Sequence, residues 1–511
     1  MNLESALRDA AARFADTPVH YDGTPPTTVT VGEIHRAAKA VAAGLRELGV
    51  RPGDPVAVQL PNRVETAIAY QAVLLAGAVL VPVVHIYGTR EVGFILRESG
   101  ARVLVVPDRW GSADYRDRLP ALRQDSALEQ VIVIGDAPAG TVAWAGLTDE
   151  RPEFVSPGRA PDDVCLLAYT SGTTAAPKGV QHTHRTLLAE VASQPEMLGG
   201  KPDDVQLAAF PAGHVAGLLG LLRFLLLGTP TVVMDGWNAE RAARLVAEHR
   251  VTFTSGSPFH LAALLDEAEA GTPVGSVREF LVGAATVPAE LVARADRAGI
   301  AAFRCYGSTE QPTISSGRSD DPLPKRQFTD GRPTPGTEIR IVGPEGTELP
   351  AGQDGEILCR GPETFIGYRD PALDDGVLLP EGWLRTGDIG NLDEDGFLTI
   401  TDRAKDVIIR GGETISSREV EDILLACPGV ADAAAIAVPD PRYGERVGAV
   451  VVLTPGAELD LNRVRAHFQA AGAARQKTPE QLEIVPDLPR NAVGKVRKTD
   501  LRARFGAATP G

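Results

Sequence analysis

The sequence contains one short segment in which hydroxyl, glycine and lysine residues are concentrated, between Thr170 and Lys178. The segment reads TSGTTAAPK, and it follows the apolar residues 164–168, which have the composition of a buried strand. Backbone N–H groups and hydroxyls in such a loop can surround phosphate oxygens, while Lys178 supplies a positive charge. The loop is not a Walker A motif, because Pro177 stands where that motif has its second glycine. We therefore expect a phosphate-binding loop at the carboxyl end of a strand.

The charge of the chain limits what it can bind. Lys and Arg number 51 against 67 Asp and Glu, which gives a formal net charge of −16 and a pI near 5.1. A nucleic-acid-binding protein needs a clustered basic face, so we expect no nucleic-acid partner. An anionic small molecule must instead be held by a local arrangement of amides, hydroxyls and a few cations.

The cysteines and the apolar segments indicate the compartment. The four cysteines form no C-x-x-C pair, which argues against a disulfide framework and a zinc ribbon; they are Cys165, Cys305, Cys359 and Cys427. The first residues lack a basic stretch followed by an apolar run, so we expect no secretory signal. The most apolar stretches, residues 67–84 and 215–227, are interrupted or short, and we expect buried helices and strands there. A cytoplasmic protein without a membrane span is predicted.

Five further segments concentrate glycine, charged and aromatic residues. In chain order they are YGSTE at 306–310, GWLRTGD at 382–388, DRAKD at 402–406, RGGETIS at 410–416 and PRNAVGK at 489–495. Together with the loop at 170–178, they resemble the ordered motifs of the adenylate-forming superfamily, which comprises acyl- and aryl-CoA synthetases, carrier-loading adenylation domains and luciferases. The resemblance extends over essentially the whole chain, and six motifs in order are far more specific than any one of them.

The resemblance implies which residues bind the nucleotide. They are Thr170, Ser171, Gly172, Thr173, Thr174, Lys178, Gly283, Ala284, Ala285, Tyr306, Gly307, Ser308, Thr309, Asp388 and Arg403. Tyr306 would offer a flat face to adenine, and Asp388 with Arg403 would contact the ribose. Glu310 would hold Mg²⁺, a hard cation that accepts one or two carboxylates plus substrate phosphates. Each of these side chains also has an ordinary structural explanation when taken singly. Tyr306 fits a core tyrosine, Asp388 an aspartate that caps a helix, and Glu310 a glutamate in a surface turn.

The resemblance also implies the chemistry. The oxygen of a carboxylic acid attacks the α-phosphorus of ATP and pyrophosphate departs, while Lys495 and Mg²⁺ on Glu310 offset the charge on the phosphoryl oxygens. His214 completes the implied catalytic set. The thiol of CoA then attacks the acyl-adenylate and AMP leaves. Without the family motifs, the segment around Lys495 would be interpreted as a solvated run of charge.

The second step would need a movement of the C-terminal part. In the superfamily a small domain turns about a hinge, and Lys405 is the matching position here. The loop that follows would then face the thiol, and its residues Gly411, Gly412 and Glu413 would line the CoA tunnel. Glycines leave space for a pantetheine arm because they carry no side chain.

The acid pocket is the least defined part of the prediction. By family correspondence it is lined by His214, Trp237 and Gly283, with Ala284 and Ala285 beside them. Several of these residues are small, which hints at room for a bulky hydrophobic acid. His214 also fits a buried structural histidine, and Trp237 also fits a core residue.

The remaining pattern predicts an α/β fold. Helical spacing at residues 33–48 and 63–76 alternates with apolar strands at 55–60 and 79–83. This rhythm predicts mainly parallel sheets covered by helices. The length of 511 residues fits about two to four domains.

The pattern changes twice along the chain. From about Gly331 it becomes β-rich, with many Gly and Pro, and from Ser417 it has its own βα alternation. We predict a large N-terminal adenylate-forming domain, a β-rich subdomain within it and a small mobile α+β C-terminal lid with its hinge at Lys405; their ranges are 1–403, about 331–402 and 404–511.

One residue departs from the family pattern, since Ala175 stands where these loops usually carry glycine. If this position needs a positive φ or close contact with the β- and γ-phosphates, the methyl group costs about 1 kcal/mol and displaces the loop. If Ala175 has a negative φ, nothing is lost. Asp402 in place of Gly and Ser417 in place of Pro are milder departures.

The sequence thus predicts an AMP-forming acyl-CoA ligase that uses a carboxylic acid, ATP, CoA and Mg²⁺. One alternative is a ligase specialised in the second half-reaction, which takes preformed acyl-adenylate and CoA because Ala175 weakens the ATP step. Another is a stand-alone adenylation enzyme that loads a carrier protein; the chain ends sixteen residues after Lys495, so we expect no fused carrier. A silent nucleotide-binding protein is disfavoured because Glu310, Asp388 and Lys495 are present. The assembly is left open between monomer and homodimer.

Overall fold

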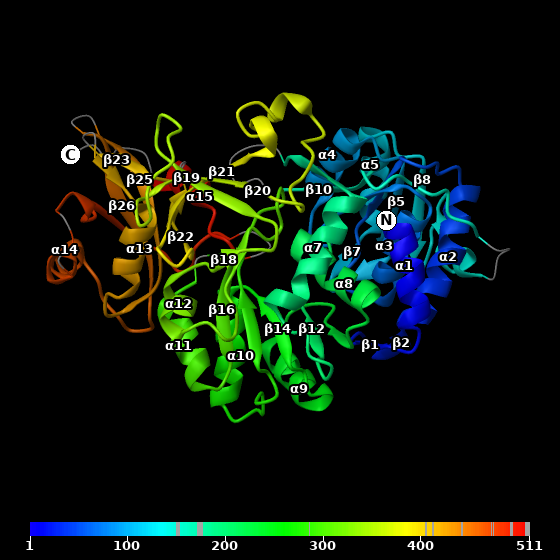
Figure 1. Ribbon diagram of the computed structural model, residues 1–511, viewed down its shortest axis with the longest axis horizontal. Coiled ribbons are helices and arrows are strands. Elements are labelled where there is room, and N and C mark those ends of the chain that lie inside the picture. The colour runs from blue at the N-terminus through cyan, green and yellow to red at the C-terminus, as the bar shows by residue number, and fades with distance from the viewer. Residues whose placement is uncertain are drawn as a thin grey trace.

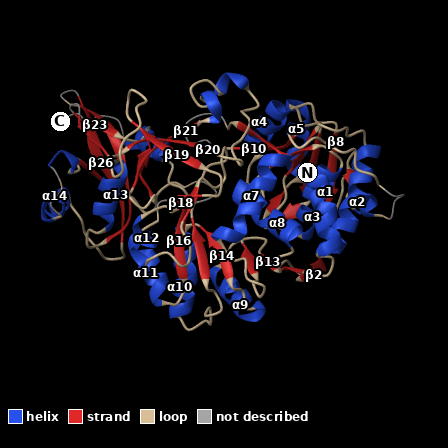
Figure 2. Cartoon of the chain, viewed as in Figure 1, coloured by secondary structure: helices blue, strands red, loops and turns tan. Residues whose placement is uncertain are grey.

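The computed structural model describes the chain except residues 150–153, 171–176, 286, 404–405, 411–412, 441–442, 472, 474, 491–493 and 506–511. Figure 1 shows the N-terminal elements on the right, a sheet with its helices in the middle, and the C-terminal elements on the left. Helices and strands are mixed throughout (Figure 2), which confirms the predicted α/β class. Within the described residues, none of the helices has the length and apolarity that a membrane crossing requires.

A seven-stranded sheet forms the first layer. Its order is β11-β10-β4-β3-β5-β8-β9, and all its pairs are parallel except β10 with β11. The strands are β3 (Pro55–Val58), β4 (Val79–Pro82), β5 (Val103–Pro107), β8 (Gln130–Ile134), β9 (Val142–Ala143), β10 (Val164–Tyr169) and β11 (Gly179–Thr183). Next to β5 in the chain, β6 (Arg109–Trp110) and β7 (Ala113–Asp114) form a small hairpin.

Most helices of the first half share one apolar core with this sheet. They are α1 (Leu3–Arg13), α2 (Val31–Glu47), α3 (Val64–Leu75), α7 (His184–Met197) and α8 (Val215–Leu227), while α4 (Thr89–Ser99) and α5 (Leu119–Asp125) pack with a second cluster and α6 (Ala145–Thr148) is short. Thr30 and Glu33 begin α2 with a reciprocal capping box, which satisfies two backbone N–H groups. The apolar stretches at 67–84 and 215–227 are buried helices and a strand, as expected.

A nine-stranded sheet forms the second layer. Its order is β18-β17-β16-β15-β14-β12-β13-β1-β2, and its central strands from β1 to β16 are parallel. The strands are β1 (Pro18–Tyr21), β2 (Thr27–Thr30), β12 (Gln206–Ala208), β13 (Thr231–Val233), β14 (Phe253–Gly256), β15 (Glu279–Val282), β16 (Ala301–Tyr306), β17 (Ser315–Ser316) and β18 (Arg332–Pro333). Its helices are α9 (Ala239–His249), α10 (Pro258–Glu269), α11 (Ala289–Arg297) and α12 (Leu323–Phe328).

The last third of the chain contains two further sheets. The four-stranded antiparallel sheet consists of β19 (Glu338–Val342), β20 (Gly355–Arg360), β21 (Leu384–Leu392) and β22 (Leu398–Arg403). The five-stranded C-terminal sheet consists of β23 (Ile408–Arg410), β24 (Glu413–Ile415), β25 (Val430–Asp440), β26 (Gly444–Leu453) and β27 (Gln481–Ile484), with helices α13 (Ser417–Leu425), α14 (Leu461–Ala470) and α15 (Lys498–Phe505). The predicted domain boundary falls between β22 and β23, which belong to different sheets.

A short segment ties the nine-stranded sheet to the four-stranded sheet. The backbone N–H of Asp330 donates to Leu398 O at 2.7 Å, and Leu398 N–H donates back to Gly331 O at 2.8 Å. Gly331 has a φ of +86°, and an added Cβ would lie 1.8 Å from the carbonyl carbon of Ser316. Only glycine fits this crossing, because both the backbone conformation and the space exclude a side chain.

We therefore expect Gly331→Ala to lower the free energy of unfolding by about 2 kcal/mol beyond the cost of a positive φ, because the methyl group overpacks the crossing. Gly346→Ala is the matched control, since Gly346 has a φ of +77° with no other atom within 4 Å of an added Cβ. The control should lose only about 1 kcal/mol. Urea unfolding of both variants measures the difference, and equal losses would contradict the steric argument.

Candidate functional site

The described ends of the predicted phosphate loop are joined to each other. β10 ends at Tyr169 and β11 begins at Gly179, so the loop connects two antiparallel strands. Thr170 N–H donates to Lys178 O at 3.1 Å, and Lys178 N–H donates to Thr170 Oγ1 at 3.1 Å. These two hydrogen bonds close the neck of the loop. The predicted phosphate contacts between them lie outside the described residues; they are Ser171, Gly172, Thr173 and Thr174, together with the departure at Ala175.

Glu310, the predicted metal contact, and Lys178, a predicted phosphate contact, both lie against Tyr368. Tyr368 Oη donates to Glu310 Oε1 at 2.7 Å, and Lys178 Nζ lies 4.7 Å from the centroid of the Tyr368 ring. Ser308 Oγ accepts from the Glu310 N–H at 3.2 Å, and His182 Nε2 lies 2.8 Å from Thr309 O. The turn is thus held by hydrogen bonds at three of its residues. The sequence did not predict Tyr368.

Two further predicted nucleotide contacts, Tyr306 and Asp388, are hydrogen-bonded directly to each other. Tyr306 Oη at the end of β16 donates to Asp388 Oδ2 on β21 at 2.7 Å, and both residues are buried. Burial raises the pKa of the Tyr306 phenol well above its usual value, which keeps it a neutral donor. Arg403, whose side chain lies outside the described part, is the cross-strand partner of Asp388 in the register of β21 and β22. In the tight turn after Tyr306, a Cβ at Gly307 would lie 1.9 Å from Pro312 O.

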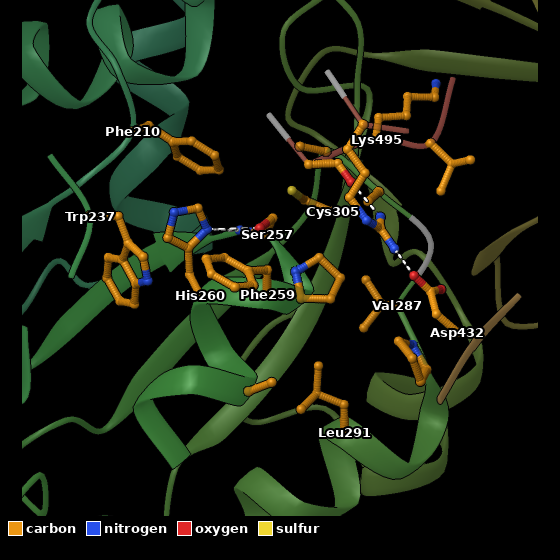
Figure 3. Close-up of a pocket in the computed structure, with 18 of the residues that line it drawn as sticks. Phe210, Trp237, Ser257, Phe259, His260, Val287, Leu291, Cys305, Asp432 and Lys495 are labelled. Carbon is orange, nitrogen blue, oxygen red and sulfur yellow. Dashed lines mark hydrogen bonds and ion pairs between the residues drawn. The ribbon is translucent and has the colours of Figure 1, made fainter. Parts of the chain in front are cut away.

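One cavity of about 1040 Å³ adjoins these residues (Figure 3). Its polar end includes Tyr306, Asp388 and Lys495. Its other end is apolar and aromatic, with Phe210, Trp237 and His260 grouped on the side away from Lys495 (Figure 3) and Trp110 and Phe259 also in the lining. The cavity therefore combines surfaces suited to a polar and to an apolar part of a ligand.

The cavity wall contains most of the predicted pocket residues but not all of them. Ala284, Ala285 and Trp237 line it, and Ala284 has a φ of +66°. Gly307, which was predicted as a nucleotide contact, lines it as well. Gly283 and His214 are not among the described lining residues. Gly283 packs against Cys305 instead, whose Sγ lies 2.6 Å from where a Cβ would stand. His214 precedes α8 behind the wall, and its Nε2 is buried without a hydrogen-bond partner among the described residues.

The segment that carries Lys495 is held against the cavity by Arg490. The Arg490 guanidinium donates from Nη1 to Gly494 O at 2.6 Å, and its Nη2 forms an ion pair with Asp432 (Figure 3). An added Cβ at Gly494 would lie 4.0 Å from Ser257 Oγ. The C-terminal part therefore lies close to the N-terminal wall of the cavity at this point.

Helix α13 connects the C-terminal part to β22. Ser417 N–H donates to Asp402 Oδ2 at 2.6 Å, and Ser416 Oγ donates to Thr401 O at 2.8 Å. Lys498 Nζ bridges Ser417 Oγ and Glu421 Oε1, at 2.7 Å from each. The predicted hinge and tunnel residues Lys405, Gly411 and Gly412 lie outside the described residues, as does the side chain of Glu413 at the start of β24.

Two family models match the chain. The model for AMP-binding enzymes covers residues 7–369, and the model for the C-terminal domain of AMP-binding enzymes covers residues 419–495. The chain belongs to the AMP-binding enzyme family. The first model alone spans more than half of the protein, and the second begins in α13.

Relatives of this AMP-binding enzyme extend over nearly its whole length. A medium-chain fatty-acid–CoA ligase of Escherichia coli (strain K12) is 34% identical over 93% of this chain and 85% of its own. A feruloyl-CoA synthase of Amycolatopsis sp is 34% identical over 96% of both chains. The crystal structure of ATP-bound MatB from Rhodopseudomonas palustris aligns with a TM-score of 0.89 and 29% identity over 99% of both chains. The resemblance to the adenylate-forming CoA synthetases and the predicted fold class are confirmed.

Several side chains that line the cavity of this AMP-binding enzyme have no predicted role from the sequence. They are Asn62, His85, Trp110, Phe210, Ser257, Phe259 and His260. The only local signal among them was the pattern Ser257-Pro258-x-His260, which is typical of a helix N-terminus. The others come from loops and strand ends far apart in the chain, so their meeting depends on the order of strands in the sheets.

The histidines at this end are neutral near pH 7. Burial lowers the pKa of His85, His214 and His260 to about 4 each, and the neighbouring His85 contributes to the lowering at His214. A base whose pKa is lower in the folded state than its unfolded value of 6.5 stabilises the fold above pH 6.5. That contribution is lost as the pH falls from 6.5 towards 4.

This shift predicts how stability depends on pH. At pH 5 the charging of His214 in the unfolded state should cost the fold about 2 kcal/mol relative to pH 7. His214→Gln cannot charge, so the loss of unfolding free energy between pH 7 and pH 5 should be smaller by about that amount. Urea unfolding of both proteins at the two pH values provides the measurement. The same loss in both would show that His214 is not buried as the fold places it.

Proposed function

We propose that this AMP-binding enzyme is an AMP-forming acid–thiol ligase, which converts a carboxylic acid to its CoA thioester through an acyl-adenylate. The observation that supports this best is one cavity in which an aromatic end adjoins Tyr306, Asp388 and Lys495. The two relatives named above are a fatty-acid–CoA ligase and a feruloyl-CoA synthase, both of which form CoA thioesters. In this assignment the apolar end holds the acid and the polar end holds the nucleotide.

The polar end would bind the nucleoside of ATP. Tyr306 lines the cavity and would offer its ring to adenine, while its hydroxyl orients the Asp388 carboxylate. Arg403 stands opposite Asp388 on the next strand, so both predicted ribose contacts arise at one place. Lys495 would offset the charge that builds on the α-phosphate while the acid oxygen attacks. The neck at Thr170 and Lys178 would set the position of the loop that holds the other phosphates.

Magnesium would depend on a single protein carboxylate. The described residues contain no cluster of three or more potential metal ligands, so these residues alone offer no complete cage. Glu310 fits Mg²⁺, because this ion commonly takes one or two carboxylates and completes its shell with phosphates and water. When bound, the ion would neutralise phosphate charge, while Tyr368 orients the Glu310 carboxylate through its hydroxyl.

The acid would be bulky and largely hydrophobic. Trp237, Phe210 and His260 line the end of the cavity that we assign to it. The feruloyl-CoA synthase relative acts on an aromatic acid, whereas the E. coli relative acts on medium-chain fatty acids. Enclosure of this end would also protect an acyl-adenylate from water.

The second half-reaction would follow a turn of the C-terminal domain about Lys405. Gly411, Gly412 and Glu413 would then form the path of the thiol, as predicted from the motif. We propose CoA as the acceptor, residues 404–511 as the moving domain, and a cytoplasmic location. A carrier protein remains the alternative acceptor.

Replacement of Lys495 by Ala separates the two half-reactions. We expect ATP-dependent formation of acyl-CoA to fall by roughly 10²- to 10³-fold, since a charge-stabilising donor is removed from the first transition state. Conversion of supplied acyl-adenylate and CoA should keep most of its rate. The control is Lys477→Ala, because Lys477 pairs with Glu419 and does not line the cavity. An equal loss in both assays would refute the division of labour.

A panel of acids and acceptors tests the function itself. Free acids with ATP and CoA should yield AMP, pyrophosphate and thioester, and the same acids should support pyrophosphate exchange. Thioester formed only from preformed adenylate would instead support the specialised ligase that Ala175 suggests. A phosphopantetheinylated carrier that outcompetes CoA would support the carrier-loading alternative, and no AMP from any acid would exclude a ligase.

A further inference from the structure

A serine–histidine pair begins helix α10 at the apolar end of the cavity. Ser257 is the N-cap residue, Pro258 is the first helical residue, and His260 is the third. The backbone N–H of Ser257 donates to His260 Nδ1 at 3.1 Å, and Ser257 Oγ lies 2.7 Å from the same nitrogen. This is a capping box in which histidine takes the place that Glu or Gln usually has.

The capping box determines the tautomer of His260. A backbone N–H can only donate, so Nδ1 must act as an acceptor and carries no proton. Burial lowers the pKa of His260 to about 4, so the ring is neutral at pH 7 and its single proton lies on Nε2. His260 therefore presents a fixed, uncharged N–H donor.

That donor has no partner among the described residues, and aromatic rings surround it. The His260 ring lies edge-on between Phe210 and Trp237, with centroids 5.5 Å and 4.5 Å away (Figure 3). The indole Nε1 of Trp237, on the same wall, is a buried donor without a partner in the described part. Buried polar groups in folded proteins are almost always hydrogen-bonded, so this unpaired indole beside the His260 donor points to an acceptor that a ligand brings.

The charge of this wall decides what kind of acceptor fits. None of the described lining residues between Asn62 and Leu291 is a lysine or an arginine. Asp235 is the one carboxylate among them, and it pairs with Arg241 at 2.9 Å. His85 is neutral, like His260. A second carboxylate on the substrate would find no cation here, whereas an ether or ketone oxygen needs only a donor.

We infer that His260 is a specificity-determining residue, which selects carboxylic acids whose ring carries an uncharged oxygen acceptor at the end far from the carboxylate. This inference rests on the proposed ligase function and defines its substrate class. Phe210 and Trp237 bind the ring, His260 Nε2–H donates to the oxygen, and Ser257 keeps that proton on Nε2. Plain alkyl and alkyl-substituted aryl acids of the same size leave the donor unpaired.

Matched acids measure this preference. The 4-methoxy and 4-ethyl forms of benzoic, phenylacetic and 3-phenylpropanoic acid have nearly equal shape but differ by one acceptor oxygen. For the chain length that fits best, the kcat/KM for AMP release should be about 10-fold or more higher with the methoxy form. No AMP from any acid would overturn both this inference and the ligase function, whereas AMP with equal kcat/KM for both forms would overturn this inference alone.

Three variants at one position distinguish specificity from a structural role. His260→Gln keeps the capping box and a side-chain donor, so it should retain the methoxy preference. His260→Glu keeps the capping box but offers only acceptors, so the preference should fall to about one while the melting temperature stays near that of the parent. His260→Phe loses both the capping box and the side-chain donor, so both the preference and the melting temperature should fall. Phe210→Leu, which removes a ring without removing a donor, should lower activity on both acids equally. A preference that survives in the Glu and Phe variants would refute the inference.

Discussion

The arrangement of the candidate site depends on one buried hydrogen bond, from Tyr306 to Asp388. Tyr306 ends the central strand run of the nine-stranded sheet, and Asp388 lies in the four-stranded sheet. A buried carboxylate without a donor is costly, so this contact fixes how the two sheets meet. The polar end of the cavity is the space beside this junction. The crossing at Gly331 supports the same junction through the backbone alone.

The elements of the fold could be predicted where a local pattern was sufficient. The apolar run that became α8 has the expected ends, Val215 and Leu227, and β19 and β20 lie in the part of the chain that was predicted to be β-rich. In these segments, burial of one or both faces requires apolar residues at regular positions, and that spacing can be read from the sequence. The order of the six motifs was likewise visible in the sequence, and the family comparison agrees with it.

The walls of the acid pocket could not be predicted because they depend on contacts between distant segments. Gly213 packs so closely on the backbone of Val84 that an added Cβ would lie 2.5 Å away, and the neighbouring His214 is not among the described lining residues. Ser257 and His260 have a recognisable capping pattern, yet only the position of β14 between β12 and β15 brings them to the cavity. Tyr368 reaches Glu310 across 58 residues of sequence. Contacts between residues this far apart in the chain leave no periodic pattern in the sequence.

The cations that line the cavity all come from one side of it. Among the described lining residues, Arg418, Arg490, Lys495 and Lys498 belong to the C-terminal part, and the N-terminal wall contributes none. In the ligase that we propose, a turn of this part would take these four cations away from the leaving pyrophosphate and leave Lys178 of the phosphate loop as its cationic contact. The remaining protein has a strongly acidic composition and would repel that anion. Product departure would then be driven by electrostatic repulsion, and its rate would fall as added salt screens the field.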